Sequence, residues 1–388
     1  MSACIVGWAH MRFGKHEGED YESMMVRVAR EDLADAGVAA ADIDAIYVGL
    51  FNGGMMQQDF PASLALQADP ALRFKPATRV ENACATGSAA VHLGANAIAA
   101  KRARNVLVVG VEKMSHVPGD QLGGILTKAS YVKTEGKEYS SFAHVFGHLT
   151  QLYFQRYGDQ SDALARIAAK NHSNGAQNPY AHVRKDLGYE FCREVSDKNP
   201  LVAGPLRRTD CSLVSDGAAA LVLSDTSNGL RSGKAILLRG MQHVSDFLPM
   251  AGRDMTFLEG CAEAWRRALD EAGVTLDDLG LVETHDCFTT AELMQYEAMG
   301  LAPRGQGARA ILEGWTEKDG KLPVNPSGGL KSKGHPIGAT GVSMHVLAAM
   351  QLAGQAGGMQ VKNAAMAGVF NMGGVGVANY CTILEPLR

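Results

Sequence analysis

Apolar and polar positions alternate along the chain in blocks that predict strands followed by helices. Short apolar runs at 3–7, 45–49 and 106–110 indicate buried strands, and the mixed stretch at 21–36, which ends before a glycine, indicates a helix. A further short strand at 77–81 leads into an alanine-rich, proline-free run at 85–100 with good helix-forming composition. This alternation predicts an α/β protein with a parallel or mixed sheet.

The region between residues 112 and 208 breaks the alternation. It is richer in Tyr, His, Gly and charged residues, and it predicts loops with one or two helices, the clearest at 162–171. An insertion of this size in an α/β domain usually carries specificity. A strand at about 218–223 returns to the core and a polar linker follows at 226–234. We therefore predict an N-terminal domain at 1–225, with the insertion at 112–208, and a C-terminal domain at 235–388.

The second half of the chain repeats the first. The triplet Ala-Gly-Val occurs at 36–38 and 272–274, a separation of 236 (272 − 36), and an Asp follows at the same separation (278 − 42). The triplet Ala-Thr-Gly recurs at 85–87 and 339–341, now 254 apart (339 − 85), so the second half carries extra loop. The shared order predicts a duplicated α/β domain. Both helices that follow these triplets are rich in small residues, which predicts a closely packed central pair.

Charge and cysteine usage exclude several classes of protein. The chain has 37 basic and 41 acidic residues and no polybasic block, so we expect no nucleic-acid partner. No apolar run approaches the ~20 residues that span a bilayer, and neither end carries a targeting pattern. Seven cysteines without Cys-x-x-Cys spacing indicate free thiols in a reducing compartment. We expect a cytoplasmic protein with no membrane association.

Cys84 lies where the strand at 77–81 turns into the following helix. The first N–H groups of a helix are unpaired and its N-terminus carries partial positive charge, which predicts a thiol pKa lowered from about 8.5 toward ~3.5–7.5. The same N–H groups can hold an oxyanion. The alternative interpretation is a small buried hydrophobic residue, as most free cysteines are.

His335 lies between Gly334 and Pro336, so it belongs to a rigid loop just before a helix. If the two halves are related, this loop occupies the place of the Cys84 turn, and the two side chains face each other. A Cys–His pair is a common way to activate a thiol nucleophile. The alternative is a histidine with a structural role.

Two further stretches are candidates for the same site. His285 and Cys287 follow the predicted strand at 281–284, and residues just past the carboxyl end of a strand are where open α/β sheets place ligands and catalysts. The glycine cluster at 371–376 precedes a predicted strand at 375–384, and glycines let backbone N–H groups approach a ligand. A buried structural histidine and a hairpin turn are the respective alternatives.

Taken together, these motifs resemble the thiolase family. The resemblance rests on Asn-Ala-Cys-Ala-Thr-Gly-Ser around Cys84, Gly-His-Pro-Ile-Gly-Ala-Thr-Gly around His335, Ser-Asp-Gly-Ala-Ala at 215–219 and the duplicated halves. His-Asp-Cys-Phe at 285–288 is similar to the sterol-carrier-protein-type branch, where ordinary thiolases have Asn-Glu-Ala-Phe. The resemblance implies the five-layered thiolase fold, with two mixed sheets around central helices, and homodimers or homotetramers.

The resemblance also implies an activity and a set of roles. The expected function is acyl-CoA C-acyltransferase, acting in 3-ketoacyl-CoA thiolysis or Claisen condensation in lipid metabolism, with coenzyme A thioesters as substrates and no resident cofactor or metal. Ordinary thiolases carry a second catalytic cysteine in a Cys-x-Gly motif, where this chain has Asn371-Met372-Gly373. The implied roles are these: nucleophile Cys84, base His335, carbonyl-polarising His285, proton-shuttling Cys287, an oxyanion hole from Cys84, Gly373 and His335, and substrate or coenzyme A contacts at Ser327, Lys333 and Phe288.

Other functions stay open at this point. A condensing enzyme resembling ketoacyl synthases has a different cysteine setting. An acyltransferase subunit that needs a small partner protein is a second alternative. A non-catalytic thiolase-like binding protein is a third, motivated by the missing Cys-x-Gly cysteine. His144 and His148 have helical metal-ligand spacing but no third ligand, so we interpret them as lid or pocket residues, and Lys331 and Lys333 as solvated unless they meet coenzyme A phosphates.

Overall fold

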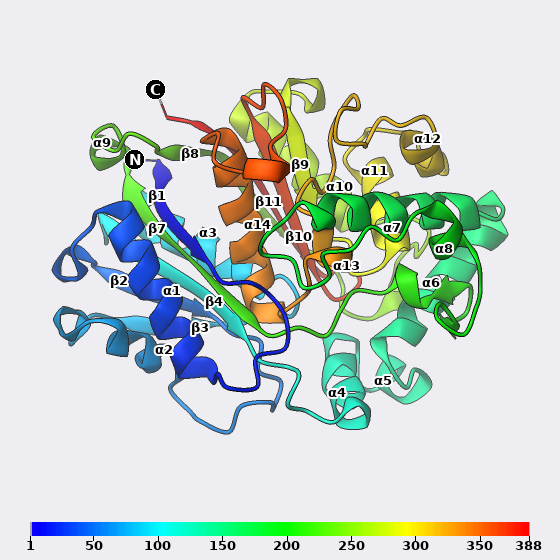
Figure 1. Cartoon of the computed structure of the whole chain (residues 1–388), viewed down its shortest axis with the longest axis horizontal. Coiled ribbons are helices and arrows are strands. Elements are labelled where there is room, and N and C mark those ends of the chain that lie inside the picture. The colour runs from blue at the N-terminus through cyan, green and yellow to red at the C-terminus, as the bar shows by residue number, and fades with distance from the viewer. Residues whose placement is uncertain (1, 388) are drawn as a thin grey trace.

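A nine-stranded sheet runs through the whole molecule in the computed structural model, which describes residues 2–387 (Figure 1). The strand order is β3-β2-β4-β7-β1-β8-β11-β10-β9. The N-terminal half contributes β1 (Ala3–His10), β2 (Ala45–Gly49), β3 (Ala77–Val80), β4 (Asn105–Glu112) and β7 (Gly217–Asp225). The C-terminal half contributes β8 (Ile236–Ser245), β9 (Leu281–Thr284), β10 (Ala367–Gly373) and β11 (Ala378–Pro386).

The two halves of the sheet have the same topology. In the first half β2 pairs in parallel with β3 and β4, and β7 pairs antiparallel with β4 and β1. In the second half β9 pairs in parallel with β10 and with Val324, and β11 pairs antiparallel with β10 and β8. The segment around Val324, just before the His335 loop, thus takes the place of β3. The predicted duplication is confirmed.

The two half-sheets meet along a short seam. Strand β1 pairs with β8 at only two positions, Cys4 with Leu237 and Ile5 with Ile236. The two mixed sheets implied by the family resemblance are therefore joined edge to edge, because the first strand of each half lies beside that of the other. The domain limits at residues 225 and 235 stay a prediction.

Helices α3 (Thr86–Ala99) and α14 (Ile337–Leu352) form the expected central pair. They touch through the repeated Ala-Thr-Gly triplets. A Cβ placed on Gly87 would lie 2.7 Å from the nitrogen of Gly341, and one placed on Gly341 would lie 2.1 Å from the nitrogen of Ser88. Only glycine allows this approach. Helix α1 (Tyr21–Ala36) packs on β1 and β7, and α10 (Glu259–Ala272) packs on β8 and β11, which gives helix, sheet, helix, sheet and helix layers.

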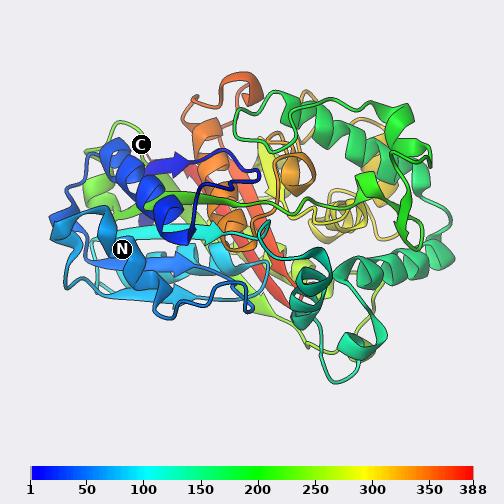
Figure 2. The same cartoon turned by 60° about the horizontal axis from the view of Figure 1, so that its bottom comes forward.

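The region between β4 and β7 lies mainly against the C-terminal half (Figures 1 and 2). Its long helix α7 packs on three helices that belong to that half. The region contains α4 (Gly119–Leu126), α5 (Glu135–Glu138), α6 (Phe142–Tyr157), α7 (Ser161–Ala176), α8 (Tyr189–Arg193), β5 (Leu201–Ala203) and β6 (Leu206–Arg207). The three helices that α7 packs on are α11 (Thr289–Ala298), α12 (Gly307–Leu312) and α13 (Gly329–Ser332). The remaining α-helices, α2 (Pro61–Leu64) and α9 (Thr226–Gly229), are short.

The predicted final strand at 375–384 is confirmed for residues 378–384, which belong to β11, whereas residues 375–377 lie in a turn. An unpredicted strand, β10, precedes that turn, in which Gly374 and Gly376 have φ of +61° and +64°. The glycine cluster is therefore a hairpin turn whose left-handed backbone favours glycine.

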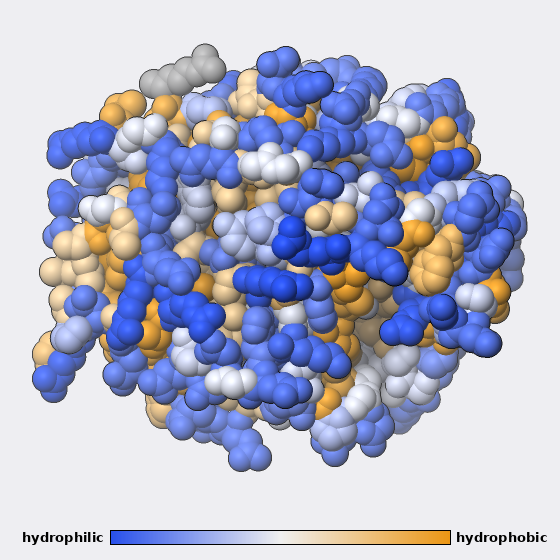
Figure 3. All heavy atoms as spheres, viewed as in Figure 1, coloured by the Kyte–Doolittle hydropathy of each residue, from blue (hydrophilic) through white to orange (hydrophobic). Residues whose placement is uncertain are grey.

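The face in Figure 3 is mostly hydrophilic, with apolar residues in small patches and in a hollow right of centre. Among residues 2–387, no helix is both long and apolar enough to cross a membrane.

Candidate active site

Cys84 lies on a tight turn between β3 and α3. Ala83 has φ of +48°, a left-handed conformation that is strained for a residue with a Cβ and costs on the order of 1–3 kcal/mol. The Thr86 hydroxyl holds the turn: it donates to the Ala83 carbonyl (2.6 Å) and accepts from the Asn82 N–H (2.8 Å). The turn thus aims the Cys84 side chain toward the C-terminal half.

His335 lies on the loop that precedes α14. Gly334 has φ of +111°, and a Cβ there would lie 2.6 Å from the hydroxyl oxygen of Ser215. That hydroxyl accepts from the His335 N–H at 3.4 Å. Ser215 belongs to the Ser-Asp-Gly turn before β7, so the N-terminal half fixes the backbone on which this histidine stands.

His285 follows β9, and the next residue fastens it to the His335 loop. Asp286 accepts hydrogen bonds from the backbone N–H groups of Leu330 (2.6 Å) and Lys331 (3.3 Å) and from the Asn171 side chain (2.8 Å). A Cβ on Gly329 would lie 2.2 Å from a carboxylate oxygen of Asp286. The two histidine-bearing loops are thereby held as one unit.

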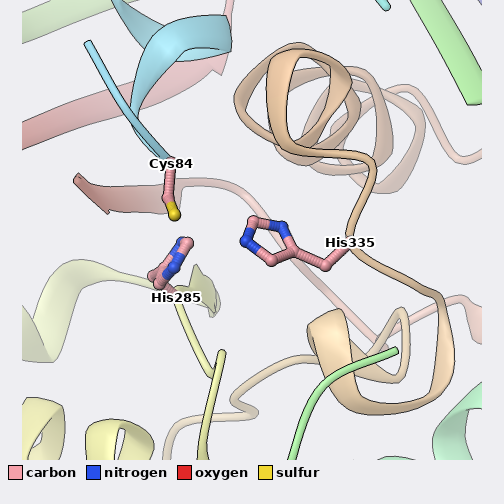
Figure 4. Close-up of side chains that lie close together, drawn as sticks. All are labelled: Cys84, His285 and His335. Carbon is pink, nitrogen blue, oxygen red and sulfur yellow. The ribbon is translucent and has the colours of Figure 1, made fainter. Parts of the chain in front are cut away.

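These three elements bring one cysteine and two histidines together (Figure 4). One ligand atom each from Cys84, His285 and His335 lies within 4.8 Å of the others. The two imidazole rings meet edge to face, with centroids 5.2 Å apart. Within residues 2–387, Nε2 of both histidines is buried without a hydrogen-bond partner. The prediction that Cys84 and His335 face each other is confirmed.

The predicted lowering of the Cys84 pKa is wrong. Burial raises the pKa of the Cys84 thiol to about 12, although the N–H of Gly374 and that of Cys84 itself hydrogen-bond the thiolate form and oppose the rise. Burial and the positive charge of Lys333 lower the pKa of His335 to about 3. Burial and its neighbour His335 also lower the pKa of His285. The resting site therefore holds a neutral thiol and two neutral imidazoles.

An apolar cavity of about 200 Å³ opens beside the thiol. Cys84, Cys287 and His335 lie in its wall, and almost all other wall side chains are hydrophobic. Phe288 also lines it and stacks on Phe146 with ring centroids 4.4 Å apart. The rest of the wall comes largely from the insertion and from the segment just before the Ser-Asp-Gly turn, including Met114, Leu126, Ala129, Phe142, Val202, Leu213 and Val214. This arrangement suits an acyl group bound next to a nucleophile.

Family profiles match most of the chain. "Thiolase, N-terminal domain" matches residues 3–188, and "Thiolase C-terminal domain-like" matches residues 243–386. The chain belongs to the thiolase family. It is 34% identical over 374 residues to an acetyl-CoA acetyltransferase of Methanothermobacter thermautotrophicus, covering 96% of each chain. It is 32% identical over 403 residues to human sterol carrier protein 2, covering 95% of this chain and 69% of the relative.

Solved structures support the thiolase fold. The structure titled "Ltp2-ChsH2(DUF35) aldolase" aligns with a TM-score of 0.86 at 21% identity, over 100% of this chain and 98% of that one. A monomeric SCP2-thiolase like protein from Mycobacterium smegmatis aligns with a TM-score of 0.75 at 20% identity, over 99% of this chain and 77% of that one.

Other predicted contacts of this thiolase lie away from the cavity wall. The Ser327 hydroxyl donates to Glu283 at 2.6 Å in the core. Lys331 and Lys333 are buried, so the expectation of solvated lysines is wrong, and a fully buried Lys333 does not present its ammonium to coenzyme A phosphates. His144 and His148 lie on α6, exposed and outside the Cys84 cavity wall. Two lysines buried in the loop before α14 need opposite charges inside the protein. The positions of the lysines in the sequence do not show that such charges are present.

Sequence reasoning missed two residues that contact the reactive groups. Asn371 appeared only as the replacement of a cysteine, yet its Nδ2 lies 3.1 Å from the Cys84 carbonyl oxygen and 2.9 Å from Nδ1 of His285. Gly374, rather than the predicted Gly373, directs its N–H at the Cys84 thiol. For both Asn371 and Gly374, the one available sequence signal was a position in a glycine-rich hairpin. The role of Gly373 stays a prediction.

Proposed function

We propose that this thiolase is an acyl-CoA C-acyltransferase that works through an acyl-enzyme on Cys84. The observation that carries the proposal is the convergence of two buried imidazole nitrogens on a cysteine in the wall of an apolar cavity, neither nitrogen having a hydrogen-bond partner among residues 2–387. The 34% identity to an acetyl-CoA acetyltransferase supports the same reaction class. Thiolysis of 3-ketoacyl-CoA and Claisen condensation are the two directions of this chemistry.

The first half-reaction transfers the acyl group to the enzyme. Cys84 Sγ attacks the thioester carbonyl carbon while Nε2 of His335 accepts the thiol proton, which a thiol with a pKa of about 12 does not release unaided. The carbon–sulfur bond to coenzyme A then breaks, the leaving thiolate takes the proton of the Cys287 thiol, and His335 keeps the proton on its Nε2. Backbone N–H groups at the Cys84 turn and at the 373–374 hairpin hold the oxyanion, and each such donor lowers the barrier by about 2.7–4 kcal/mol.

The second half-reaction uses the other two groups. In condensation, the Cys287 thiolate removes a proton from the α-carbon of acetyl-CoA while the Nε2–H groups of protonated His335 and of His285 hydrogen-bond its thioester oxygen. The resulting carbanion attacks the acyl carbon on Cys84, and the leaving Cys84 sulfur takes its proton back from His335. In thiolysis the same steps run in reverse, and Cys287 accepts the proton of the coenzyme A thiol. The apolar cavity wall favours unbranched or branched hydrocarbon acyl groups over charged ones.

Intact-mass measurement tests the proposal. Wild type, Cys84→Ala and Cys287→Ala are each incubated briefly with acetyl-CoA and with acetoacetyl-CoA. We expect an acetyl adduct on wild type and on Cys287→Ala but none on Cys84→Ala. Cys287→Ala is expected to lose net condensation and thiolysis while keeping the adduct. Cys261→Ala, a buried cysteine outside the cavity wall, is the matched control and is expected to behave as wild type.

A partner-dependent acyltransferase is the second candidate. Val202 and Val214 line the cavity and are 43% and 41% exposed, so apolar surface continues from the cavity to the outside. A solved relative of similar fold carries a DUF35 protein in its title. An adduct or turnover that forms only after a small partner protein is added would favour this candidate. No adduct under either condition would leave a binding role. A homodimer and a cytoplasmic location stay predictions.

A further inference from the structure

The two histidines at the site differ in what their second ring nitrogen contacts. Each ring has Nε2 directed at the Cys84 side and Nδ1 bonded to a polar side chain behind it. In a neutral imidazole one nitrogen donates a hydrogen bond and the other accepts one. The group behind each ring therefore decides what each Nε2 offers to a substrate.

The proton of His335 lies on Nδ1. Its partner is the Thr340 hydroxyl, with Nδ1 and Oγ1 2.7 Å apart. That hydroxyl donates its single hydrogen to the Pro336 carbonyl oxygen, 3.0 Å away. Toward the histidine it can only accept, so Nδ1 donates and Nε2 carries a free lone pair. This is the form that accepts the Cys84 proton.

The contacts of Asn371 require the opposite arrangement at His285. The Cys84 carbonyl oxygen, 3.1 Å away, accepts a hydrogen bond, so the amide must turn its NH₂ group toward it. The second hydrogen of the same NH₂ group points at Nδ1 of His285 at 2.9 Å. Nδ1 therefore accepts, and the imidazole proton lies on Nε2.

We propose that Asn371 is a positioning residue that keeps His285 in the Nε2–H tautomer, opposite to His335, so that the site presents one acceptor and one donor to the thioester. The catalytic consequence rests on the proposed acyl transfer: His335 accepts the thiol proton in the first half-reaction, and the Nε2–H of His285 donates to the thioester oxygen of acetyl-CoA in the second. The residue that replaces the second cysteine of ordinary thiolases thus has a role of its own.

The same arrangement disfavours a metal ion at these residues. Three ligand atoms from one cysteine and two histidines within 4.8 Å resemble an open zinc site, but a metal needs a lone pair on each ligand nitrogen. Nε2 of His285 carries a proton instead. An aspartate at position 371 would accept a proton from Nδ1 and free Nε2, as carboxylates behind metal-ligating histidines do.

Long-range ¹H–¹⁵N correlation NMR of ¹⁵N-histidine-labelled wild type tests the tautomers directly, and His285→Gln and His335→Gln spectra assign the signals. At pH 7.5 we expect His285 protonated on Nε2 and His335 protonated on Nδ1. A wild-type His285 protonated on Nδ1 would overturn the proposal. This measurement needs no turnover and no altered Asn371, so it stands whether or not acyl transfer is observed.

Asn371→Asp provides the second arm, with Asn379→Asp as the matched control. Asn379 is equally buried on the neighbouring strand, where its NH₂ group donates to the carbonyls of Val244 and Gly376. For Asn371→Asp we expect His285 to move its proton to Nδ1, and the condensation step to slow by about 10²–10³-fold, the size for one lost oxyanion donor, while acetyl transfer to Cys84 keeps its rate. The control is expected to keep the wild-type His285 spectrum.

Cobalt binding supplies a readout that a loss of packing would not produce. Added Co²⁺ is expected to give a thiolate-to-cobalt charge-transfer band with Asn371→Asp, and none with wild type, with the control, or with Asn371→Asp that also carries Cys84→Ala. A band of equal strength in wild type would contradict the assigned Nε2 proton. Failure of acetyl transfer in wild type, with the expected spectra and cobalt results, would sink the proposed function and leave the tautomer assignment intact.

Discussion

The Cys84 turn and the His335 loop occupy equivalent places in the two halves and are built in opposite ways. The first joins β3 to α3 through residues 81–85 and relies on a strained Ala83 and one threonine. The second spans residues 325–336 before α14, contains a helical turn of its own, and is tied down by buried carboxylates such as Asp286.

In the proposed mechanism, this difference divides one reaction between the two copies of a duplicated scaffold. The short turn delivers a thiol close to the first N–H groups of a helix. The long loop has room to carry an imidazole across the interface to that thiol. In the proposed mechanism neither half contains the nucleophile and its base together, so the pairing of α3 with α14 brings the two groups into one site. The following predictions test that division.

Removing the base from the long loop has the largest expected effect. For His335→Asn, acetyl transfer to Cys84 is expected to slow by about 10²–10⁴-fold, the usual contribution of a general base. Quenched-flow mass spectrometry gives the rate. His182→Asn is the control, because His182 contacts the same Ser215 hydroxyl (2.9 Å) from outside the cavity wall. Equal rates for His335→Asn and wild type would contradict the assigned role.

Adding one methyl group between the central helices has the next largest effect. Gly341→Ala and Gly87→Ala are each expected to lower the free energy of unfolding by about 1–3 kcal/mol through overpacking. The loss should be larger for Gly341, where the new Cβ would lie 2.1 Å rather than 2.7 Å from backbone nitrogen. Gly124→Ala in α4 has open space and should be neutral or slightly stabilising. Urea denaturation measures all three.

The buried side chain of His92 on α3 should make the free energy of unfolding depend on pH. Burial lowers the pKa of His92 to about 3 in the folded protein, against 6.5 unfolded. Folding therefore releases a proton below pH 6.5, and the stability contributed by the neutral ring is complete above that pH and lost as pH falls toward 3. Relative to His92→Gln, wild type should lose up to about 1.4 kcal/mol per pH unit below 6.5.

Unfolding titrations of both proteins between pH 5 and 8.5 check this prediction. Above pH 7.5 the difference in unfolding free energy between them should be constant, which serves as the internal control. A difference that stays constant down to pH 5 would show that His92 is charged in the folded state.

The sequence predicted the strand–helix alternation and the duplicated halves because both depend on local patterns, and the resemblance to the thiolase family implied the layers. The helix at 21–36 and the strands at 45–49 and 281–284 agree with the observed bounds. Strand β10 was missed because its residues 367–373 run into a glycine-rich turn that locally resembles loop. The short seam between β1 and β8 depends on how two distant strands meet, which no local pattern encodes.

The site was predicted in outline and not in its electrostatics. Spacing and the repeat placed Cys84 opposite His335, and strand ends placed His285 nearby. The helix N-terminus suggested an acidic thiol, but burial outweighs it and raises the pKa. The buried lysines escaped prediction because their counter-charges come from distant segments: Lys333 has Glu283 and Asp286 as its opposite charges. The role of Asn371 depends on a three-way contact that exists only in the folded chain.

The glycine contact between α3 and α14 has a consequence for the chain while it is still being synthesised. During synthesis the N-terminal half leaves the ribosome first and can begin to fold alone. It then carries Cys84 without His285 and His335, which lie in the half that is made later. Under the acyl-transfer mechanism proposed above, Cys84 gains its base only when the second copy of the repeat has docked on the first. A truncated or half-folded molecule is therefore expected not to react with thioesters.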